Sequence, residues 1–413
     1  MLGQTRLVPS FAHLLKLAAS LAAAAFAIGC GGGGSAPSTP PVHGKWTVLV
    51  YMNAANDLDV FSPLNIIQMQ QAATASSDVR FVVQWKQSTK VSTTATFNGT
   101  RRYLITPSLS GGVTSQVVQD LGLSVDMGIP GSLKSFIQWG KAHYPADHTA
   151  VILWDHGNGW LPASRGSKTA PPAFSYDDQT GHSIQIWQLN QAFQGLHVDI
   201  AAFDCSLMQM AEVAYQFVGK ADYVAASEES PPGSGYPYQR VLGAFTATPD
   251  ASPRTLSKAF VDGMMNEPTY NTMKVEESVI DTTQMANVAS AAAALRVQLV
   301  ANASSLITIA PALRTSVQSY EPTVNRFFFD ATDLCNQLNM ASTSSGVQSA
   351  CVNLSAAVSN AVIWEGHNSN SPGSHGLGID FSPSSSFTKV SADYHRLSWD
   401  TASGWSQWLA IAP

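Results

Sequence analysis

Residues 198–217 read VDIAAFDCSLMQMAEVAYQF, and this stretch decides the fold that the sequence predicts. It begins with an apolar run at 200–203, which predicts a buried strand. Its second half places apolar residues at helical spacing, so the chain is expected to pass from strand to helix within a few residues. Asp204, Cys205 and Ser206 lie between the two elements. In open α/β sheets such a junction lies at the carboxyl edge, where ligands and catalytic groups collect.

Further apolar runs precede and follow this stretch, and helical patterns separate them. Strands are predicted at 45–52, 79–85, 148–154 and 221–226, with helices between them. The alternation predicts an α/β core within residues 45–248, built on a mainly parallel sheet with helices on both faces. An Asn98-Gly99 turn between the runs 93–97 and 100–105 predicts a hairpin inside this core.

The pattern changes after residue 248, so residues 249–413 are expected to form a largely α-helical C-terminal region. Helices are predicted at 256–265, 285–310, 317–338 and 347–364, with a strand at 275–280. A late strand near 376–381 is expected either to rejoin the main sheet or to form a small sheet of its own.

The first thirty residues predict export. They contain Arg6 and Lys16, an apolar stretch at 17–28 and a small-residue end before Cys30, as in a secretory signal peptide. That end resembles a bacterial lipobox, which predicts lipidation of Cys30; the alternative is an ordinary cleaved signal. Residues 31–44 predict a flexible Gly/Ser/Pro tether. The protein is therefore expected outside the cytoplasm, held to a bacterial membrane by lipid.

Charge and cysteine usage narrow the class of protein. The net charge is −6 and the sequence has no long basic run, so nucleic acid is not an expected partner. Exported chains meet oxidising conditions, and Cys335 and Cys351 flank a Ser/Thr-rich loop. We expect a disulfide between them, with two separate core thiols as the alternative. Cys205 is then either buried and inert or a reactive thiol.

A second strand end also carries reactive side chains. The strand at 148–154 runs into Asp155-His156-Gly157, and in a parallel sheet this end points the same way as Asp204-Cys205-Ser206. An imidazole beside a thiol predicts nucleophilic catalysis, because the histidine takes the thiol proton. We expect the N–H of Gly157, together with N–H groups of a helix beginning near Leu207, to bind an oxyanion.

Four segments resemble successive motifs of the clostripain-like cysteine peptidases, in the family's order. They are WTVLVYMNAANDLD at 46–59, AVILWDHGNGW at 150–160, DIAAFDCSLMQMAEVAYQF at 199–217 and ADYVAASEESPPGSGYPY at 221–238. The resemblance implies a caspase-like, three-layer α/β sandwich and cleavage of peptide or protein substrates. It also implies a His/Cys dyad that needs no metal, with His156 at the position of the catalytic histidine.

The nucleophile does not match the family's pattern in register. Where the family reads Phe-Asp-Ala-Cys-Leu-Met, this chain reads FDCSLM at 203–208, so Ser206 occupies the nucleophile position and Cys205 precedes it. Three outcomes follow: Cys205 acts from a shifted position, Ser206 acts as a weaker nucleophile, or the site is inactive and the protein only binds. Since a thiol ionises far more readily than a hydroxyl beside a histidine, we favour Cys205.

Substrate preference and calcium are the last expectations. Family members favour a basic residue before the cut, and Asp204 is the first candidate to bind it. Glu229 is a second candidate, whereas Ser234 stands where the family often has an acid. The pairs at 177–178 and at Asp57 and Asp59 leave calcium binding open, the alternative being ordinary turn and helix-cap carboxylates.

Overall fold

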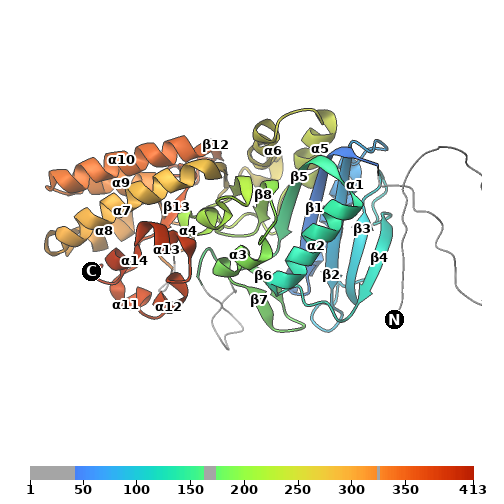
Figure 1. Ribbon diagram of the computed structural model, residues 1–413, viewed down its shortest axis with the longest axis horizontal. Coiled ribbons are helices and arrows are strands. Elements are labelled where there is room, and N and C mark those ends of the chain that lie inside the picture. Colours follow the sequence, from blue (N-terminus) through green and yellow to red (C-terminus); the bar gives the residue numbers. More distant parts are fainter. Residues whose placement is uncertain (1–41, 162–173, 323–325) are drawn as a thin grey trace, which may run out of the picture. The chain divides into compact units, whose positions relative to one another are not determined.

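A nine-stranded sheet organises the fold, in the order β12-β10-β9-β8-β5-β1-β2-β3-β4 (Figure 1). In this computed structural model, strands β9, β8, β5, β1 and β2 are parallel, and antiparallel strands extend the sheet on both sides. The strands are β1 (Gly44–Ala54), β2 (Val79–Gln87), β3 (Gly99–Leu104), β4 (Gln116–Gly122), β5 (Ala146–Trp154), β8 (Val198–Asp204), β9 (Ala221–Ala226), β10 (Glu276–Asp281) and β12 (Val362–His367).

The structure describes residues 42–161, 174–322 and 326–413. The predicted signal peptide, Cys30 and nearly all of the tether lie outside the described residues. Residues 41–413 form one compact unit. Within the described ranges, no helix is both long enough and apolar enough to cross a membrane.

Helices cover both faces of the sheet, which is why β1 is buried along almost its whole length. One face packs against α2 (Pro130–His143), α3 (Leu189–Ala192) and α4 (Ala211–Ala214). The other packs against α1 (Ser62–Ala72), α5 (Tyr238–Ala247) and α6 (Pro253–Met265). The three predicted layers are therefore present.

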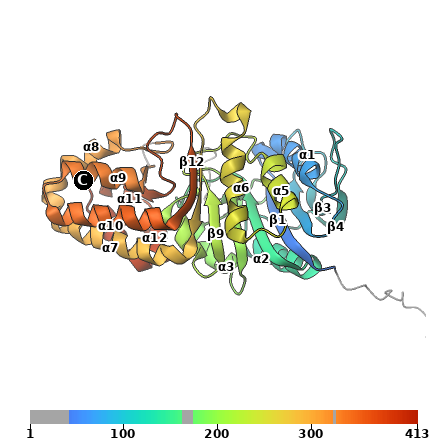
Figure 2. The same ribbon diagram turned by 90° about the horizontal axis from the view of Figure 1, so that it is seen from above.

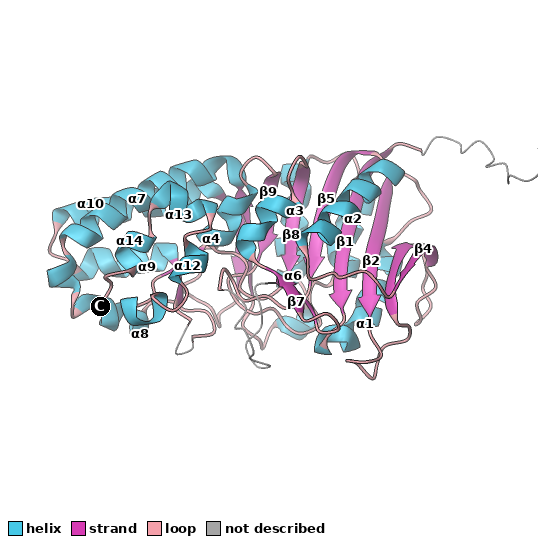
Figure 3. Cartoon of the chain, turned by 60° about the horizontal axis from the view of Figure 1, so that its bottom comes forward, coloured by secondary structure: helices cyan, strands magenta, loops and turns pink. Residues whose placement is uncertain are grey.

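The later helices gather on the β12 side of the sheet (Figures 2 and 3). They are α7 (Met285–Ala301), α8 (Ile309–Ser316), α9 (Ala331–Ala341), α10 (Ser345–Ala361), α11 (Ser384–Phe387), α12 (Ser391–Tyr394), α13 (Ser398–Ser403) and α14 (Ser406–Leu409). Two small sheets pair β6 (Phe174–Asp177) with β7 (His182–Ile184) and β11 (Phe328–Asp330) with β13 (Gly378–Asp380). Short 3-10 turns are η1 (Asp57–Phe61), η2 (Ile186–Gln188), η3 (Tyr215–Phe217), η4 (Pro268–Tyr270), η5 (Thr282–Gln284) and η6 (Ala303–Leu306).

The region after residue 249 is largely helical in the described residues, and it also completes the main sheet. β10 pairs with β9 and β12 pairs with β10, so the sheet runs across the predicted boundary at 248–249. The late strand is present as β13, in a small sheet of its own.

Two predictions from local sequence were wrong. The hairpin at 93–105 does not form: β3 pairs with β2, and the run 93–97 is a loop. The Asp59 carboxylate accepts hydrogen bonds from Ser92 and Thr94 at 2.7 and 2.8 Å, which holds this part of the chain away from a ladder. The helix expected at 317–338 begins only at Ala331, where the Asp330 side chain caps it.

Candidate active site

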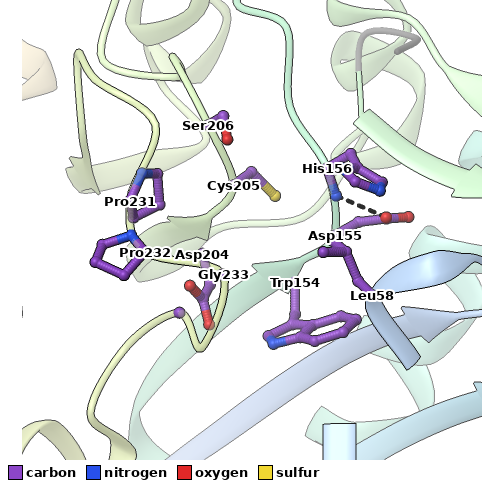
Figure 4. Close-up of a pocket in the computed structure, with 11 residues that line it drawn as sticks. Leu58, Trp154, Asp155, His156, Asp204, Cys205, Ser206, Pro231, Pro232 and Gly233 are labelled. Atoms are coloured by element: carbon purple, nitrogen blue, oxygen red, sulfur yellow. Dashed lines mark hydrogen bonds between the residues drawn. The ribbon is translucent and has the colours of Figure 1, made fainter. Parts of the chain in front are cut away.

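The carboxyl ends of β5 and β8 lie side by side, as the sequence predicted. Trp154 and Asp204 are paired in the register of these parallel strands, so the residues that follow them meet at one edge. A pocket opens there (Figure 4). It is lined by Leu58, Trp154, Asp155, His156, Asp204, Cys205, Ser206, Pro231, Pro232, Gly233 and Gly235. The structure thus brings together His156 and both candidate nucleophiles.

The His156 side chain is held by an acid that precedes it by almost a hundred residues. Its Nε2 lies 2.6 Å from Asp57 Oδ1, at the start of η1. Because an ionised carboxylate only accepts hydrogen bonds, Nε2 carries the proton in this contact. In Figure 4 the ring extends away from Cys205 and Ser206.

Asp155 anchors the backbone of the histidine, a role that the sequence analysis did not predict. Its carboxylate accepts hydrogen bonds from the backbone N–H of His156 at 2.6 Å, from Asn56 Nδ2 at 2.7 Å and from the backbone N–H of Tyr176. Burial raises the pKa of Asp155 well above its usual range. The position of an acid directly before the histidine, at a strand end, is the sequence signal that could have indicated this role.

Cys205 is buried and its thiol is occupied. The residue is 1% exposed and belongs to the core on one face of the sheet, together with Leu153 and Phe203. Its Sγ donates a hydrogen bond to the carbonyl oxygen of Leu153 at 3.2 Å. Burial first, and then the charges of Asp155 and Asp204, raise the pKa of the Cys205 thiol well above its usual range. The thiol is therefore protonated at neutral pH.

Ser206 is the more accessible of the two candidate nucleophiles. It is half-buried, and its Oγ has no hydrogen-bond partner in the described part of the chain. Over the same residues, no hydrogen bond joins the His156 ring to either Cys205 or Ser206. The three side chains are neighbours that are not yet connected as a catalytic pair.

Gly157 allows the two strand ends to approach each other. A Cβ atom at this position would lie 2.2 Å from the carbonyl oxygen of Ser206 and 3.0 Å from Cys205 Cβ, so a side chain does not fit. The second predicted oxyanion donor was wrong. Helix α4 begins at Ala211 rather than near Leu207, and the Leu207 N–H already donates to the carbonyl oxygen of Glu229 at 3.1 Å.

Asp204 presents a buried carboxyl group to the pocket. It accepts hydrogen bonds from the backbone N–H of Tyr236 at 3.0 Å and from the Tyr238 hydroxyl at 2.8 Å. Gly235, with φ of +69°, leaves the space in front of it open, because a Cβ there would lie 2.5 Å from both carboxyl oxygens. Burial raises the pKa of Asp204 to about 7. A cation that enters the pocket would meet an acid poised to ionise.

The other two candidate substrate-binding residues do not line this pocket. Ser234 Oγ is hydrogen-bonded to the Tyr270 hydroxyl at 2.8 Å. Glu229 is 3% exposed, burial raises the pKa of its carboxyl group, and its Oε2 lies 3.8 Å from Lys274 Nζ. The side chains of Ser234 and Glu229 therefore interact with other residues of the chain in this structure.

Cys335 and Cys351, on α9 and α10, are free, buried thiols here rather than the disulfide expected from the sequence. The Cys351 side chain and burial raise the pKa of the Cys335 thiol well above its usual range. The structure thus shows the alternative, two buried core thiols, and the disulfide remains a prediction.

The carboxylates considered for calcium already have protein partners. Asp177 forms a buried ion pair with Lys86 at 2.6 Å. Asp59 is bonded to hydroxyl and amide groups, and Asp57 to His156. No group of three or more His, Cys, Asp or Glu residues in the described ranges has a geometry that fits a metal ion. These residues do not fit a calcium site.

This chain is similar to known proteins in both sequence and fold. The model of the clostripain family matches residues 50–410. Clostripain of Hathewaya histolytica is 25% identical over 225 residues, which cover 49% of this chain and 42% of that protein. The matched part thus spans less than half of that relative's length.

Two crystal structures share the fold over 88% of this chain, each with a TM-score of 0.66. One is an inactive zymogen C11 protease from Parabacteroides distasonis, 20% identical, with 99% of its chain covered. The other is a secreted C11 cysteine protease from Bacteroides thetaiotaomicron in complex with an irreversible peptide inhibitor, 22% identical, with 100% covered. The likeness confirms the caspase-like α/β fold predicted from the sequence.

Proposed function

Because this chain belongs to the clostripain family of cysteine peptidases, we propose that it cleaves peptide bonds after Arg or Lys, with His156 as base and Cys205 as nucleophile. One observation carries the preference for a basic residue: the Asp204 carboxyl group faces the pocket that His156 and Cys205 also line. A guanidinium or ammonium group would favour the ionised form of Asp204, and a poorly hydrated pocket strengthens that attraction.

The proposed chemistry begins when the Cys205 thiol leaves the Leu153 carbonyl and gives its proton to His156. The thiolate attacks the scissile carbonyl carbon, and the oxyanion that forms takes a hydrogen bond from the N–H of Gly157. The imidazolium then protonates the leaving amine as the C–N bond breaks, which leaves a thioester on Cys205. Water, deprotonated by His156, hydrolyses the thioester and restores the thiol.

A second candidate function is peptide binding without cleavage. It is favoured by the burial of Cys205, its hydrogen bond to Leu153 and the raised pKa of its thiol. Under this alternative, Asp204 still accepts a basic side chain, while Ser206 stands in the family's nucleophile position without reacting.

Labelling by a thiol-reactive peptide that ends in Arg separates the two functions. Endopeptidase action predicts one adduct on the wild type, none on Cys205→Ala, an adduct on Ser206→Ala and loss of the Arg preference in Asp204→Asn. Binding of the Arg peptide in calorimetry, with neither adduct nor cleavage, would establish the second function instead. Equal labelling of the wild type and Cys205→Ala would rule out Cys205 as the nucleophile.

We further propose that the protein is anchored outside the cytoplasm through a lipid on Cys30. The support is the sequence of residues 1–30, which matches an export signal that ends in a lipobox. Mass spectrometry of the mature N-terminus tests this: Cys30 should be the first residue and should carry acyl groups. An unmodified N-terminus, or an intact leader, would contradict the anchor.

A further inference from the structure

The loop after β1 holds His156 at two points. The ring is bonded to Asp57 through Nε2, at 2.6 Å. The backbone N–H is bonded to Asp155, which in turn accepts from Asn56. Since Asn56 and Asp57 are adjacent in the chain, these contacts close a ring that runs from the histidine backbone to its imidazole. Among the described residues, no other side chain of the pocket is bonded to the β1 loop through both its backbone and its side chain in this way.

The contacts that fix the backbone at Asp57 are important because the Asp57 side chain is 82% exposed. An exposed ion pair alone stabilises little, because water competes for both partners. Here the backbone at Asp57 is fixed by its neighbour. Asn56 is fully buried, caps η1 by accepting from the Leu58 N–H at 3.0 Å, and donates to the Asp155 carboxylate and to the Tyr176 carbonyl oxygen. The carboxylate is therefore presented to the ring from a rigid turn.

We propose that Asp57 is a positioning residue for His156, holding the imidazole by its Nε2–H so that Nδ1 is the nitrogen that accepts a proton. A carboxylate on one ring nitrogen fixes which nitrogen is protonated and limits rotation of the ring. Its kinetic consequence rests on the proposed peptidase function. The predicted protonation of Nε2 in the His156 ring does not depend on that function.

Asp178 provides a matched control on the same side of the histidine. Asp178 is exposed. Burial and the charge of Asp57 raise its pKa, and the charge of His156 lowers it, so it lies close to both residues. Its backbone N–H donates to the carbonyl oxygen of Ala55 at 3.0 Å, and its carboxyl group forms no hydrogen bond to the His156 ring among the described residues. Removing this carboxylate changes the local charge as much as removing Asp57 does, but it leaves the bond to the ring in place.

The test compares the wild type with Asp57→Ala and Asp178→Ala by ¹H–¹⁵N spectra of the histidine rings, assigned with a His156→Gln variant. We expect a slowly exchanging Nε2–H signal for His156 in the wild type and in Asp178→Ala, and its loss in Asp57→Ala. Retention of that signal in Asp57→Ala, or its equal loss in both variants, would overturn the proposal. Melting temperatures check that all proteins are folded.

Kinetics add a second readout that a merely structural role does not produce. With cleavage present in the wild type, we expect Asp57→Ala to lower kcat about tenfold at an unchanged KM, since misplacing a general base affects the chemical step. Asp178→Ala should keep kcat. A wild-type kcat in Asp57→Ala refutes the positioning role while the peptidase function stands. An inactive wild type refutes the function, and the ring spectra still decide the role of Asp57.

Discussion

Trp154 and Asp204 are paired neighbours on the parallel strands β5 and β8, and this register brings both candidate nucleophiles to the strand end that carries His156. Cys205 and Ser206 both line the pocket there, but they differ in burial. Cys205 belongs to the core and is 1% exposed, whereas Ser206 is half-buried.

Moving the thiol by one residue tests the consequence of this difference in burial. In a Cys30→Ser background, the double variant Cys205→Ala/Ser206→Cys should react with a small thiol reagent at pH 7 at least about tenfold faster than the Cys205 protein. A pKa lower by one unit alone supplies that factor, and the thiol becomes accessible as well. The rate is measured from the intact mass over time.

The Cys205→Ala single variant controls for the buried thiols Cys335 and Cys351 and should remain unlabelled on this timescale. If the double variant reacts no faster than the Cys205 protein, burial does not control the reactivity of a thiol at this strand end.

Gly157→Ala should destabilise the protein and disturb the site. The added methyl group would lie 2.2 Å from the Ser206 carbonyl oxygen, and backbone atoms cannot rotate away. Overpacking of this kind costs about 1–3 kcal/mol, measurable as a lower denaturant midpoint. Gly131→Ala is the control, because Gly131 lies in the first turn of α2 with nothing within 4 Å of an added Cβ. A loss of stability as large at Gly131 would remove the steric explanation.

Gly235→Ala should close the pocket to basic side chains. Its Cβ would lie 2.5 Å from both oxygens of Asp204, where the cation is proposed to bind. We expect the affinity for an Arg peptide to fall at least about tenfold, since the carboxyl group proposed to bind the cation is blocked. Gly219→Ala shares the positive φ, +73° against +69°, but has open space at its Cβ. It should therefore carry the backbone strain without the loss of binding, which calorimetry measures; equal losses would place Asp204 outside the binding site.

Oxidation should join Cys335 and Cys351. Both thiols are buried on the packed helices α9 and α10, and Cys351 lies close enough to Cys335 to raise its pKa, although the two residues are 16 positions apart in sequence. Closing a loop of this length stabilises a protein by about 3 kcal/mol in the chain-entropy account. Treatment with oxidised glutathione should lower the intact mass by two hydrogen atoms and raise the melting temperature, and Cys335→Ser should abolish both effects. A mass that stays unchanged would mean that the two thiols do not form a bond.

The parts of the fold that local sequence predicted are those whose burial is nearly complete. The run at 45–52 reads as a central strand because helices cover both faces of β1, and the same holds for β5 and β8. The hairpin and the helix at 317–338 failed because distant residues decide those segments. Asp59 holds the loop at 92–94, and β11 pairs with β13, some fifty positions further along the chain.

The candidate site also contains residues that the sequence predicted and contacts that it did not. Strand ends brought His156, Cys205 and Ser206 together by topology alone, which a sequence pattern reveals. The contact between Asp57 and His156 spans 99 positions and depends on the path of a loop, so no local pattern signals it. Cys205 lies one residue beyond the end of β8, where side chains no longer alternate regularly between the two faces of the sheet. The sequence pattern therefore does not show whether Cys205 is buried.

Glu212 should make the protein less stable as the pH rises. It is fully buried on α4, and burial raises the pKa of its carboxyl group to about 8. Its Oε1 accepts from the Asp380 N–H at 3.1 Å and from the Tyr394 hydroxyl at 2.9 Å, while its Oε2 has no partner among the described residues. The folded state thus favours the protonated acid, which an unfolded chain loses near pH 4.3.

The direction of the pH dependence follows from this difference between the pKa of Glu212 in the folded and in the unfolded protein. The stabilisation from neutral Glu212 is complete below about pH 4.3 and is lost as the pH rises towards 8, by up to about 1.4 kcal/mol per pH unit. Glu212→Gln keeps an acceptor for Tyr394 and cannot ionise. Its free energy of unfolding should therefore fall less steeply than that of the wild type between pH 5 and 8, with a gap on the order of 3 kcal/mol developing by pH 7.

Urea unfolding at several pH values measures these slopes, and the slope decides the question rather than the absolute stability, because the new amide N–H group also needs a partner. Asp380, whose pKa burial raises to about 6, titrates in both proteins, and its charge helps to raise the pKa of Glu212 in the wild type. Glu267→Gln is the control: the bonds of Glu267 to Thr269 and Arg240 hold its pKa below the usual range, so this variant should keep the wild-type slope above pH 5. Parallel curves for Glu212→Gln and the wild type would mean that Glu212 is already ionised in the folded protein.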